Sequence, residues 1–247
     1  MLRALLPTSH PVRTRIAAMS TLYLVRHGQA SFGSEDYDRL SQTGVQQVEW
    51  LRDHWQTIDE RLDAIYAGRL RRQRHTAEIL AAPAGSAVTT LAQFDEYDAD
   101  RLLRHAAESG QLQHVTAEML MSRRFDARSF QRELEATGLA WIDGRLHAAG
   151  GESWREFRTR VGDGLRELVR REGRARRIAV CTSAGVIGAA VGEVLGLSDH
   201  ETIKLSWAVH NSSVTRLHYD DRRLSLSAFN IVPHLEHPQR RALVTFR

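Results

Sequence analysis

Short apolar segments alternate with longer segments of helical periodicity along most of this chain. The expected strands are residues 21–26, 62–67, 88–92, 177–182, 213–219 and 223–229. The expected helices are residues 43–56, 69–82, 100–121, 126–138, 153–172 and 184–196. Because alternating strands and helices form a mostly parallel sheet covered on both faces, we expect an α/β fold, a three-layer α/β/α sandwich. The last two strands flank Asp220-Asp221 as a hairpin, which predicts one antiparallel edge strand.

The chain is expected to form one domain. Its 247 residues are enough for a large domain with a substantial core, and no linker or internal repeat divides residues 20–247. Residues 97–150 interrupt the alternation and are expected to form a helical insertion that walls the site. Residues 1–19 carry three arginines, two prolines and no acidic residue. Since Met19 directly precedes the first strand, we expect this segment to be a disordered or non-native extension.

The composition narrows the expected partners. No apolar stretch reaches the roughly 18 residues that a membrane span needs, so no membrane partner is expected. The formal net charge is +4, yet Lys204 is the only lysine. This arginine skew is typical of codon bias rather than of a nucleic-acid-binding stripe, and we expect no nucleic-acid partner. Cys181 is the only cysteine, which excludes an internal disulfide and fits a reducing, cytoplasmic location.

The most informative motif is Arg26-His27-Gly28-Gln29, which follows the first expected strand. Ligands of open α/β sheets bind just past the carboxyl ends of the strands. Histidine is a nucleophile toward phosphorus, and the guanidinium fork of arginine matches phosphate oxygens. The motif thus indicates phosphoryl chemistry, although the same residues fit an ordinary strand end with two solvated side chains.

Further segments decide between these interpretations. They are Leu40-Ser-Gln-Thr-Gly44, Ile65-Tyr66, the arginine-rich segment 70–80, Phe94-Asp-Glu96-Tyr, Gly150-Gly-Glu-Ser153, Thr182-Ser-Ala-Gly-Val-Ile187 and Asn211-Ser-Ser-Val-Thr215. With Leu24-Val-Arg-His-Gly28 they resemble, in order, the motifs of the histidine phosphatase superfamily, also called phosphoglycerate mutase-like. The resemblance implies a phosphoglycerate mutase-like sandwich and a phosphohistidine intermediate.

Residue by residue, the resemblance implies His27 as nucleophile and Arg26 as a phosphate clamp. Aligning segment 70–80 with the family's "Leu-x-Arg-Ala-x-Gln-Thr-Ala" makes Arg72 the second clamp, although the Ala-Gly-Arg before Leu70 departs from the usual Ser-Ser-Pro. The neighbouring Arg69, Arg71 and Arg74 are interpreted as a solvated helix face.

Glu96 is the candidate proton donor. A carboxylic acid serves a leaving alkoxide near neutral pH only when an apolar or anionic neighbourhood keeps it protonated. Asp95 and Asp98 are the competing carboxylates. Gln29 and Ser31 are candidate contacts to phosphate, or else loop residues.

One position departs from the family. Ser183 stands where the second family histidine is expected in "Ser-His-Gly-Gly-Val-Ile", so a neutral hydroxyl replaces an imidazole. The amides of Ala184 or Gly185 at the next helix N-terminus still favour an anion. His210 is a candidate to enter the pocket from the neighbouring strand, against a surface or structural role, and His234 is interpreted as structural. We expect Arg26, His27, Arg72, Glu96 and Ser183 to converge on one pocket.

The leading hypothesis is a metal-independent phosphatase of a small phosphorylated metabolite, with no cofactor, because the twelve histidines form no metal-ligand cluster. The alternative is a pseudophosphatase, inactive or weakly active, that binds a phosphorylated ligand or protein; Ser183 motivates it. A phosphoglycerate mutase-type phosphotransferase is the third hypothesis. It is disfavoured because the "Glu-Arg-x-Tyr-Gly" segment of the mutases is not seen.

Overall fold

The computed structural model describes residues 19–31, 38–113, 116, 118–119, 126–147, 150–220 and 222–246. Residues 1–18 of the N-terminal extension expected over 1–19 therefore lie outside the described residues. Within the helix expected over 100–121 and the insertion expected over 97–150, residues 114–115, 117, 120–125 and 148–149 lie outside them as well.

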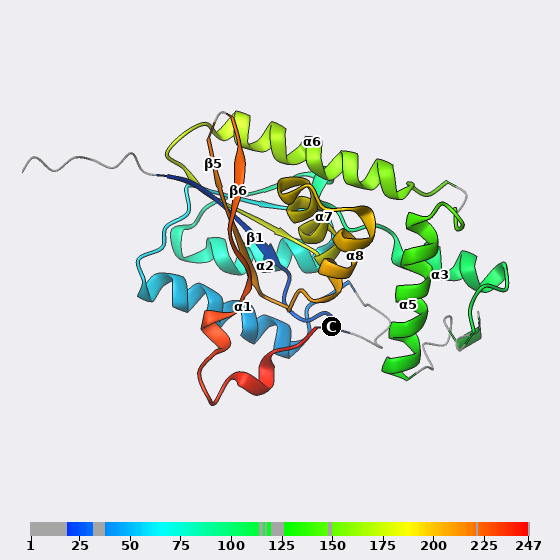
Figure 1. Cartoon of the computed structure of the whole chain (residues 1–247). Coiled ribbons are helices and arrows are strands. Elements are labelled where there is room, and N and C mark those ends of the chain that lie inside the picture. The colour runs from blue at the N-terminus through cyan, green and yellow to red at the C-terminus, as the bar shows by residue number, and fades with distance from the viewer. Residues whose placement is uncertain are drawn as a thin grey trace, which may run out of the picture.

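One six-stranded sheet forms the centre of the protein (Figure 1). Its strands are β1 (Ser20–Arg26), β2 (Ala64–Ala67), β3 (Val88–Thr90), β4 (Arg177–Thr182), β5 (Val214–Tyr219) and β6 (Leu224–Ile231), in the order β3-β2-β4-β1-β5-β6. The pairs among β1, β2, β3 and β4 are parallel, whereas β5 is antiparallel to both β1 and β6. The α/β class is confirmed. The reversed strand is β5, one position in from the edge, and its hairpin partner β6 forms the edge.

The described part of the chain contains seven helices. They are α1 (Gln42–Thr57), α2 (Arg71–Ala81), α3 (Ala99–Glu108), α5 (Ala127–Ile142), α6 (Trp154–Glu172), α7 (Ala184–Leu195) and α8 (Asp199–Trp207). Figure 1 shows α6 and α7 on one side of the sheet and α1 on the other.

Strand β1 shows why both faces are covered. Its side chains alternate: Leu22 and Leu24 join the buried cluster that includes α6 and α7, while Tyr23 and Val25 join the cluster that includes α1 and α2. Successive strand residues point to opposite faces of a sheet, so an apolar strand without alternation requires helices on both sides.

Helix ends differ from the sequence expectation where a local signal overrides periodicity. Helix α3 ends at Glu108, and Gly110 follows with φ +68°, a left-handed conformation that glycine adopts at helix ends. Helix α8 was not predicted. Its signal is a capping box in which Ser198 caps the helix and Glu201 bonds back to it, the same motif that correctly placed the start of α6 at Ser153 and Glu156.

The parallel strands β1, β2 and β4 end side by side at Arg26, Ala67 and Thr182. This is the edge of the sheet at which ligands bind in open α/β folds. Within the described residues, no helix is long and apolar enough to cross a membrane.

Candidate functional site

His27 lies immediately after β1, and both its backbone N–H and its backbone carbonyl are hydrogen-bonded. Its N–H donates to the Thr182 carbonyl at the end of β4 (2.8 Å), and its carbonyl accepts from the Ser212 N–H (3.2 Å) and from Nδ2 of Asn211 (3.3 Å). At Gly28 a Cβ atom would lie 2.3 Å from the Gly44 carbonyl oxygen. Only glycine permits this approach of the loop after β1 to α1.

The imidazole of His27 is 4% exposed and has a defined tautomer. Its Nδ1–H donates to the Gly28 carbonyl (2.7 Å), and its Nε2 accepts from Nε of Arg72 (3.1 Å). The pKa of His27 is well below its usual value because burial disfavours the charged ring, and the guanidinium groups of Arg72 and Arg26 add to the effect. Nε2 therefore carries a free electron pair at neutral pH.

Two arginines supply positive charge beside this ring. Arg72, in the first turn of α2, donates from Nη1 to Asp38 (2.7 Å), whose carboxylate also accepts the Arg71 N–H (2.8 Å). Arg26, the last residue of β1, donates to the Val209 carbonyl. Because both groups influence the pKa of His27 and of Glu96, the four side chains share one electrostatic environment.

Glu96 follows the short 3₁₀ turn Ala92–Phe94 and points to α7. One carboxyl oxygen accepts the Gly185 N–H (2.9 Å) and the other accepts the Tyr97 N–H (3.1 Å). Burial raises the pKa of Glu96, while these N–H groups and the two arginines act in the opposite direction. A Cβ atom on Gly185 would lie 2.2 Å from the carboxyl, so this glycine lets helix α7 approach Glu96.

Ser183 is 2% exposed and occupies the N-cap position of α7, without a capping hydrogen bond from its side chain. Its Oγ accepts from Nε2 of Gln73 (2.8 Å), an amide that also donates to the Phe94 carbonyl (3.3 Å). Ala184 is the first residue of α7. Hydrogen bonds and chain neighbours thus connect the five residues through β1, α2, the segment 94–97 and the N-terminus of α7, and their convergence on one pocket stays a prediction.

The remaining predicted contacts are His210, Gln29 and Ser31. Nδ1 of His210 is 3.1 Å from Oδ1 of Asn230, and the ring packs on Phe246 with centroids 4.4 Å apart. Oε1 of Gln29 accepts from the Ser41 hydroxyl (2.9 Å), at the start of α1. The Ser31 N–H donates to the Arg39 carbonyl (2.8 Å). Phosphate contacts by His210 and Gln29 stay predictions.

Several residues around the site were not singled out from the sequence. Gln73 lies within the arginine-rich motif but was not assigned a role, and Asp38 has no local signal because its partner Arg72 is 34 positions away. Ser212, at φ +56°, bonds through Oγ to Nε2 of the buried His234 (2.8 Å). This pair supports the backbone that holds His27.

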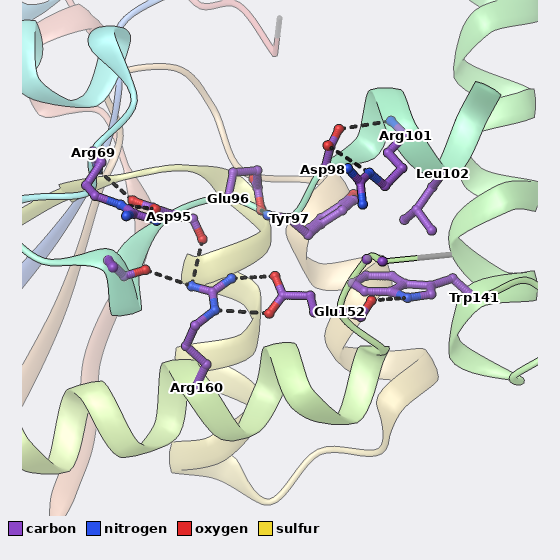
Figure 2. Close-up of a pocket in the computed structure, with 13 residues that line it drawn as sticks. Arg69, Asp95, Glu96, Tyr97, Asp98, Arg101, Leu102, Trp141, Glu152 and Arg160 are labelled. Atoms are coloured by element: carbon purple, nitrogen blue, oxygen red, sulfur yellow. Dashed lines mark hydrogen bonds and ion pairs between the residues drawn. The ribbon is translucent and has the colours of Figure 1, made fainter. Parts of the chain in front are cut away.

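A cavity of about 380 Å³ adjoins Glu96 (Figure 2). It is lined by Arg69, Ala92, Asp95, Glu96, Tyr97, Asp98, Arg101, Leu102, Trp141, Gly150, Gly151, Glu152 and Arg160. Among the residues that the structure describes, no group of three or more histidine, cysteine, aspartate or glutamate side chains is placed to hold a metal ion.

Comparison with known proteins adds one family and several solved structures. Residues 22–232 match the model of the histidine phosphatase superfamily (branch 1). No curated protein shows significant similarity to the chain.

Three solved structures share the fold. A phosphoserine phosphatase mutant from Entamoeba histolytica in complex with phosphoserine is 19% identical (TM-score 0.62), with 88% of this chain and 100% of that chain covered. A phosphoglycerate mutase from Bacillus anthracis is 16% identical (TM-score 0.61; 88% and 96% covered). A mycobacterial glucosyl-3-phosphoglycerate phosphatase is 23% identical (TM-score 0.58; 85% and 98% covered).

Proposed function

The chain belongs to branch 1 of the histidine phosphatase superfamily, and from this premise we propose that it hydrolyses a phosphate monoester of a small metabolite through a phosphohistidine at His27. The observation that carries the proposal is the tautomer of the His27 imidazole. Its Nδ1–H is fixed on the Gly28 carbonyl and its Nε2 faces Arg72. This is the tautomer that a histidine nucleophile needs.

In the first step, the electron pair of Nε2 forms a bond to phosphorus while the bond to the ester oxygen breaks. The leaving oxygen takes a proton from the carboxylic acid of Glu96, whose raised pKa favours the protonated form. The bond from Nδ1–H to the Gly28 carbonyl stabilises the positive charge that develops on the ring.

In the second step, the Glu96 carboxylate takes a proton from water, and the oxygen attacks phosphorus in line with the N–P bond. That bond breaks, inorganic phosphate leaves, and His27 is again neutral with Glu96 protonated. The cycle consumes one water and needs no other reactant. The site supplies its positive charge through guanidinium groups, so we propose metal-independent chemistry.

Arg26 and Arg72 hold the phosphoryl oxygens during both steps. A phosphoryl group bound to Nε2 lies where Arg72 now donates to that nitrogen, so the N–H is already aimed at its position. Donors preorganised toward developing charge are a major source of catalysis. The folds shared with a phosphoserine phosphatase and a glucosyl-3-phosphoglycerate phosphatase support a small phosphorylated substrate.

Ser183 favours a second candidate, a pseudophosphatase that binds a phosphorylated ligand or protein. Replacing a cationic donor by a hydroxyl removes a contact of roughly 1.5–3 kcal/mol, or about 10- to 150-fold in rate. A binder, however, has no use for a neutral nucleophile beside a proton donor. The mutase-type phosphotransferase would share the first step and pass the phosphoryl group to a second alcohol.

The deciding experiment is hydrolysis of p-nitrophenyl phosphate in EDTA by the wild type and by His27→Ala. Turnover that survives chelation and falls at least about 1000-fold in His27→Ala is expected from a phosphohistidine enzyme. Absence of turnover in the wild type, together with phosphate binding in calorimetry, would favour the binder. Phosphoryl transfer to an added alcohol in preference to water would favour the phosphotransferase.

A further inference from the structure

The cavity beside Glu96 lies where the leaving group of the proposed reaction must be. In an in-line displacement the leaving oxygen stands opposite the nucleophile, next to the acid that protonates it. Glu96 accepts the Gly185 N–H at the start of α7, two residues from Ser183, whose hydroxyl accepts from Gln73 beside Arg72, and it also lines the cavity. Figure 2 shows the cavity between the segment that carries Glu96 and Tyr97, helix α3, the end of α5 and Arg160 of α6.

The first feature of this cavity is that Arg160 already has a full set of acceptors. Its Nε and Nη2 donate to the two carboxylate oxygens of Glu152 (3.0 and 2.6 Å). Its Nη1 donates to the carbonyls of Ala92, Gln93 and Asp95 (3.1, 2.9 and 3.1 Å). The bonds from Nη1 fix the segment 92–95, which leads to Glu96. Arg160 therefore positions this wall of the cavity, and the carboxylate of Glu152 balances the charge of its guanidinium.

The other two cations in the wall are also paired with carboxylates. Arg69 donates from its backbone N–H and from Nε to the carboxylate of Asp95 (2.6 and 2.7 Å). Arg101 forms an ion pair with Asp98, with Nε 3.6 Å from the carboxylate. The wall therefore holds three guanidinium groups and four carboxyl groups, one of which is the Glu96 acid. Once Glu96 is protonated, the wall has no net charge.

Part of the wall is apolar. Tyr97, Leu102 and Trp141 line the cavity, and the rings of Tyr97 and Trp141 lie 4.9 Å apart between centroids. Such a surface packs against the C–H face of a ring or carbon chain. The carboxylate oxygens around it accept hydrogen bonds and cannot donate them.

From this wall we propose, on the basis of the proposed function, that the leaving group is an uncharged, hydroxylated alcohol such as a sugar or another polyol. Its hydroxyl groups donate to the carboxylates of the wall, and its carbon frame packs on Tyr97 and Leu102. An alcohol that carries a second anionic group, such as a carboxylate, gains no net attraction and competes with Asp95, Asp98 and Glu152 for their arginines. Such substrates are selected against.

The test compares glycerol 3-phosphate with 3-phosphoglycerate, two three-carbon esters that differ by a hydroxymethyl group and a carboxylate. We expect kcat/KM at least tenfold higher for glycerol 3-phosphate, and higher still for glucose 6-phosphate because its ring covers the apolar wall. Equal or faster hydrolysis of 3-phosphoglycerate overturns the inference, and p-nitrophenyl phosphate reports independently on the proposed function.

Asp98→Asn removes one negative charge from the wall and keeps the helix cap, since asparagine also caps α3. The variant should narrow the ratio of the two esters two- to fivefold at low salt. Asp53→Asn on α1 removes the same charge next to Arg52, on the other face of the sheet, and should leave the ratio unchanged. An unchanged ratio in Asp98→Asn contradicts the role given to the wall.

Binding gives a second measurement that does not depend on turnover. Calorimetric titration of both esters onto His27→Ala should show tighter binding of glycerol 3-phosphate. If no ester is hydrolysed by the wild type, the proposed function fails, and the two affinities still decide the inference. Equal affinities would then overturn it.

Discussion

Nε of Arg72 donates a hydrogen bond to Nε2 of His27 across 3.1 Å. The two residues come from different elements, the first turn of α2 and the end of β1, and Asp38 holds the other end of the guanidinium at 2.7 Å. Arg72 therefore lowers the pKa of the nucleophile and fixes which nitrogen carries the electron pair. The same N–H is aimed at the oxygens of a phosphoryl group on that nitrogen.

Replacing the guanidinium of Arg72 should change both the pKa of His27 and the binding of the phosphoryl oxygens. Arg72→Lys keeps the charge but loses the planar fork, so we expect kcat/KM to fall about 10- to 100-fold. Arg72→Gln also removes the charge, and the pKa of His27 should rise toward its usual value, which an NMR titration of the ring measures. Arg74→Gln, on the exposed side of α2, is the control. A His27 pKa unchanged in Arg72→Gln would contradict the coupling.

The raised pKa of Glu96 predicts the pH dependence of the first step. Glu96 must be protonated to donate, so kcat/KM for an alkyl phosphate should fall as pH rises through this pKa, by up to tenfold per unit. His27 must be neutral, and because its pKa is lowered, it limits the rate only at lower pH. The profile from pH 4 to 9 should therefore have its maximum on the acid side.

Esters whose leaving groups differ in basicity test the role of Glu96 as an acid. In Glu96→Gln, the first step with an alkyl phosphate should slow about 100- to 10,000-fold, the usual contribution of a general acid. The first step with p-nitrophenyl phosphate should slow far less, because p-nitrophenolate leaves without a proton. Burst kinetics with both esters measure this step. An equal loss for both would exclude Glu96 as the proton donor.

Ser183 lies where a histidine would need room. Nε2 of Gln73 is 2.8 Å from its hydroxyl, so an imidazole at position 183 collides with this amide. We expect Ser183→His combined with Gln73→Ala to raise kcat/KM at least tenfold above Gln73→Ala alone, since it restores a charge-assisted contact. A double variant no faster than Gln73→Ala would show that the site works without a second imidazole.

Local patterns predicted most of the fold. The strands and most helices were placed by alternation and periodicity, and Arg26, His27, Arg72, Glu96 and Ser183 by the resemblance of their segments to the motifs of the family. These signals are contained in a few consecutive residues, and strands that end at one edge of a parallel sheet bring them together without further information.

Long-range contacts could not be predicted in this way. Asp38 reaches Arg72 from a loop, and Gln73 reaches Ser183 across 110 positions. The partners of His210, Asn230 in β6 and the ring of Phe246, likewise come from other elements. Each of these contacts depends on how separate elements pack, and no short segment of sequence encodes it.

His234 predicts a pH dependence of stability. It is 2% exposed, and burial lowers its pKa to about 3. Since the unfolded chain binds this proton near pH 6.5 and the folded chain only near pH 3, stability falls as pH decreases between these values. For one proton, the free energy of unfolding changes by about 1.4 kcal/mol per pH unit. Between pH 7 and 5, urea unfolding should show a mean slope that is about 0.7 proton smaller in His234→Leu than in the wild type, because the unfolded imidazole is already partly protonated at pH 7. Equal slopes would contradict the assignment.

A buried polar network connects the C-terminal segment to the nucleophile. Nε2 of Gln47 donates to the Thr245 hydroxyl (2.9 Å), which donates to Oδ1 of Asn211 (2.9 Å), and Nδ2 of Asn211 donates to the His27 carbonyl (3.3 Å). Gln47 also accepts the Gln29 N–H (2.9 Å). The segment 27–29 is thus held from both sides, and we expect Thr245 to act as a positioning residue for His27.

Thr245→Val keeps the shape of the side chain but leaves Gln47 and Asn211 without their shared partner, at a cost of about 1–3 kcal/mol of stability. If the network only stabilised the fold, kcat per folded molecule would not change. Because it positions His27, we expect kcat to fall about fivefold or more with KM within twofold, and Thr245→Ser to restore it. Thr57→Val, at the exposed end of α1, should change neither. A loss of stability in Thr245→Val at unchanged kcat would limit Thr245 to a structural role.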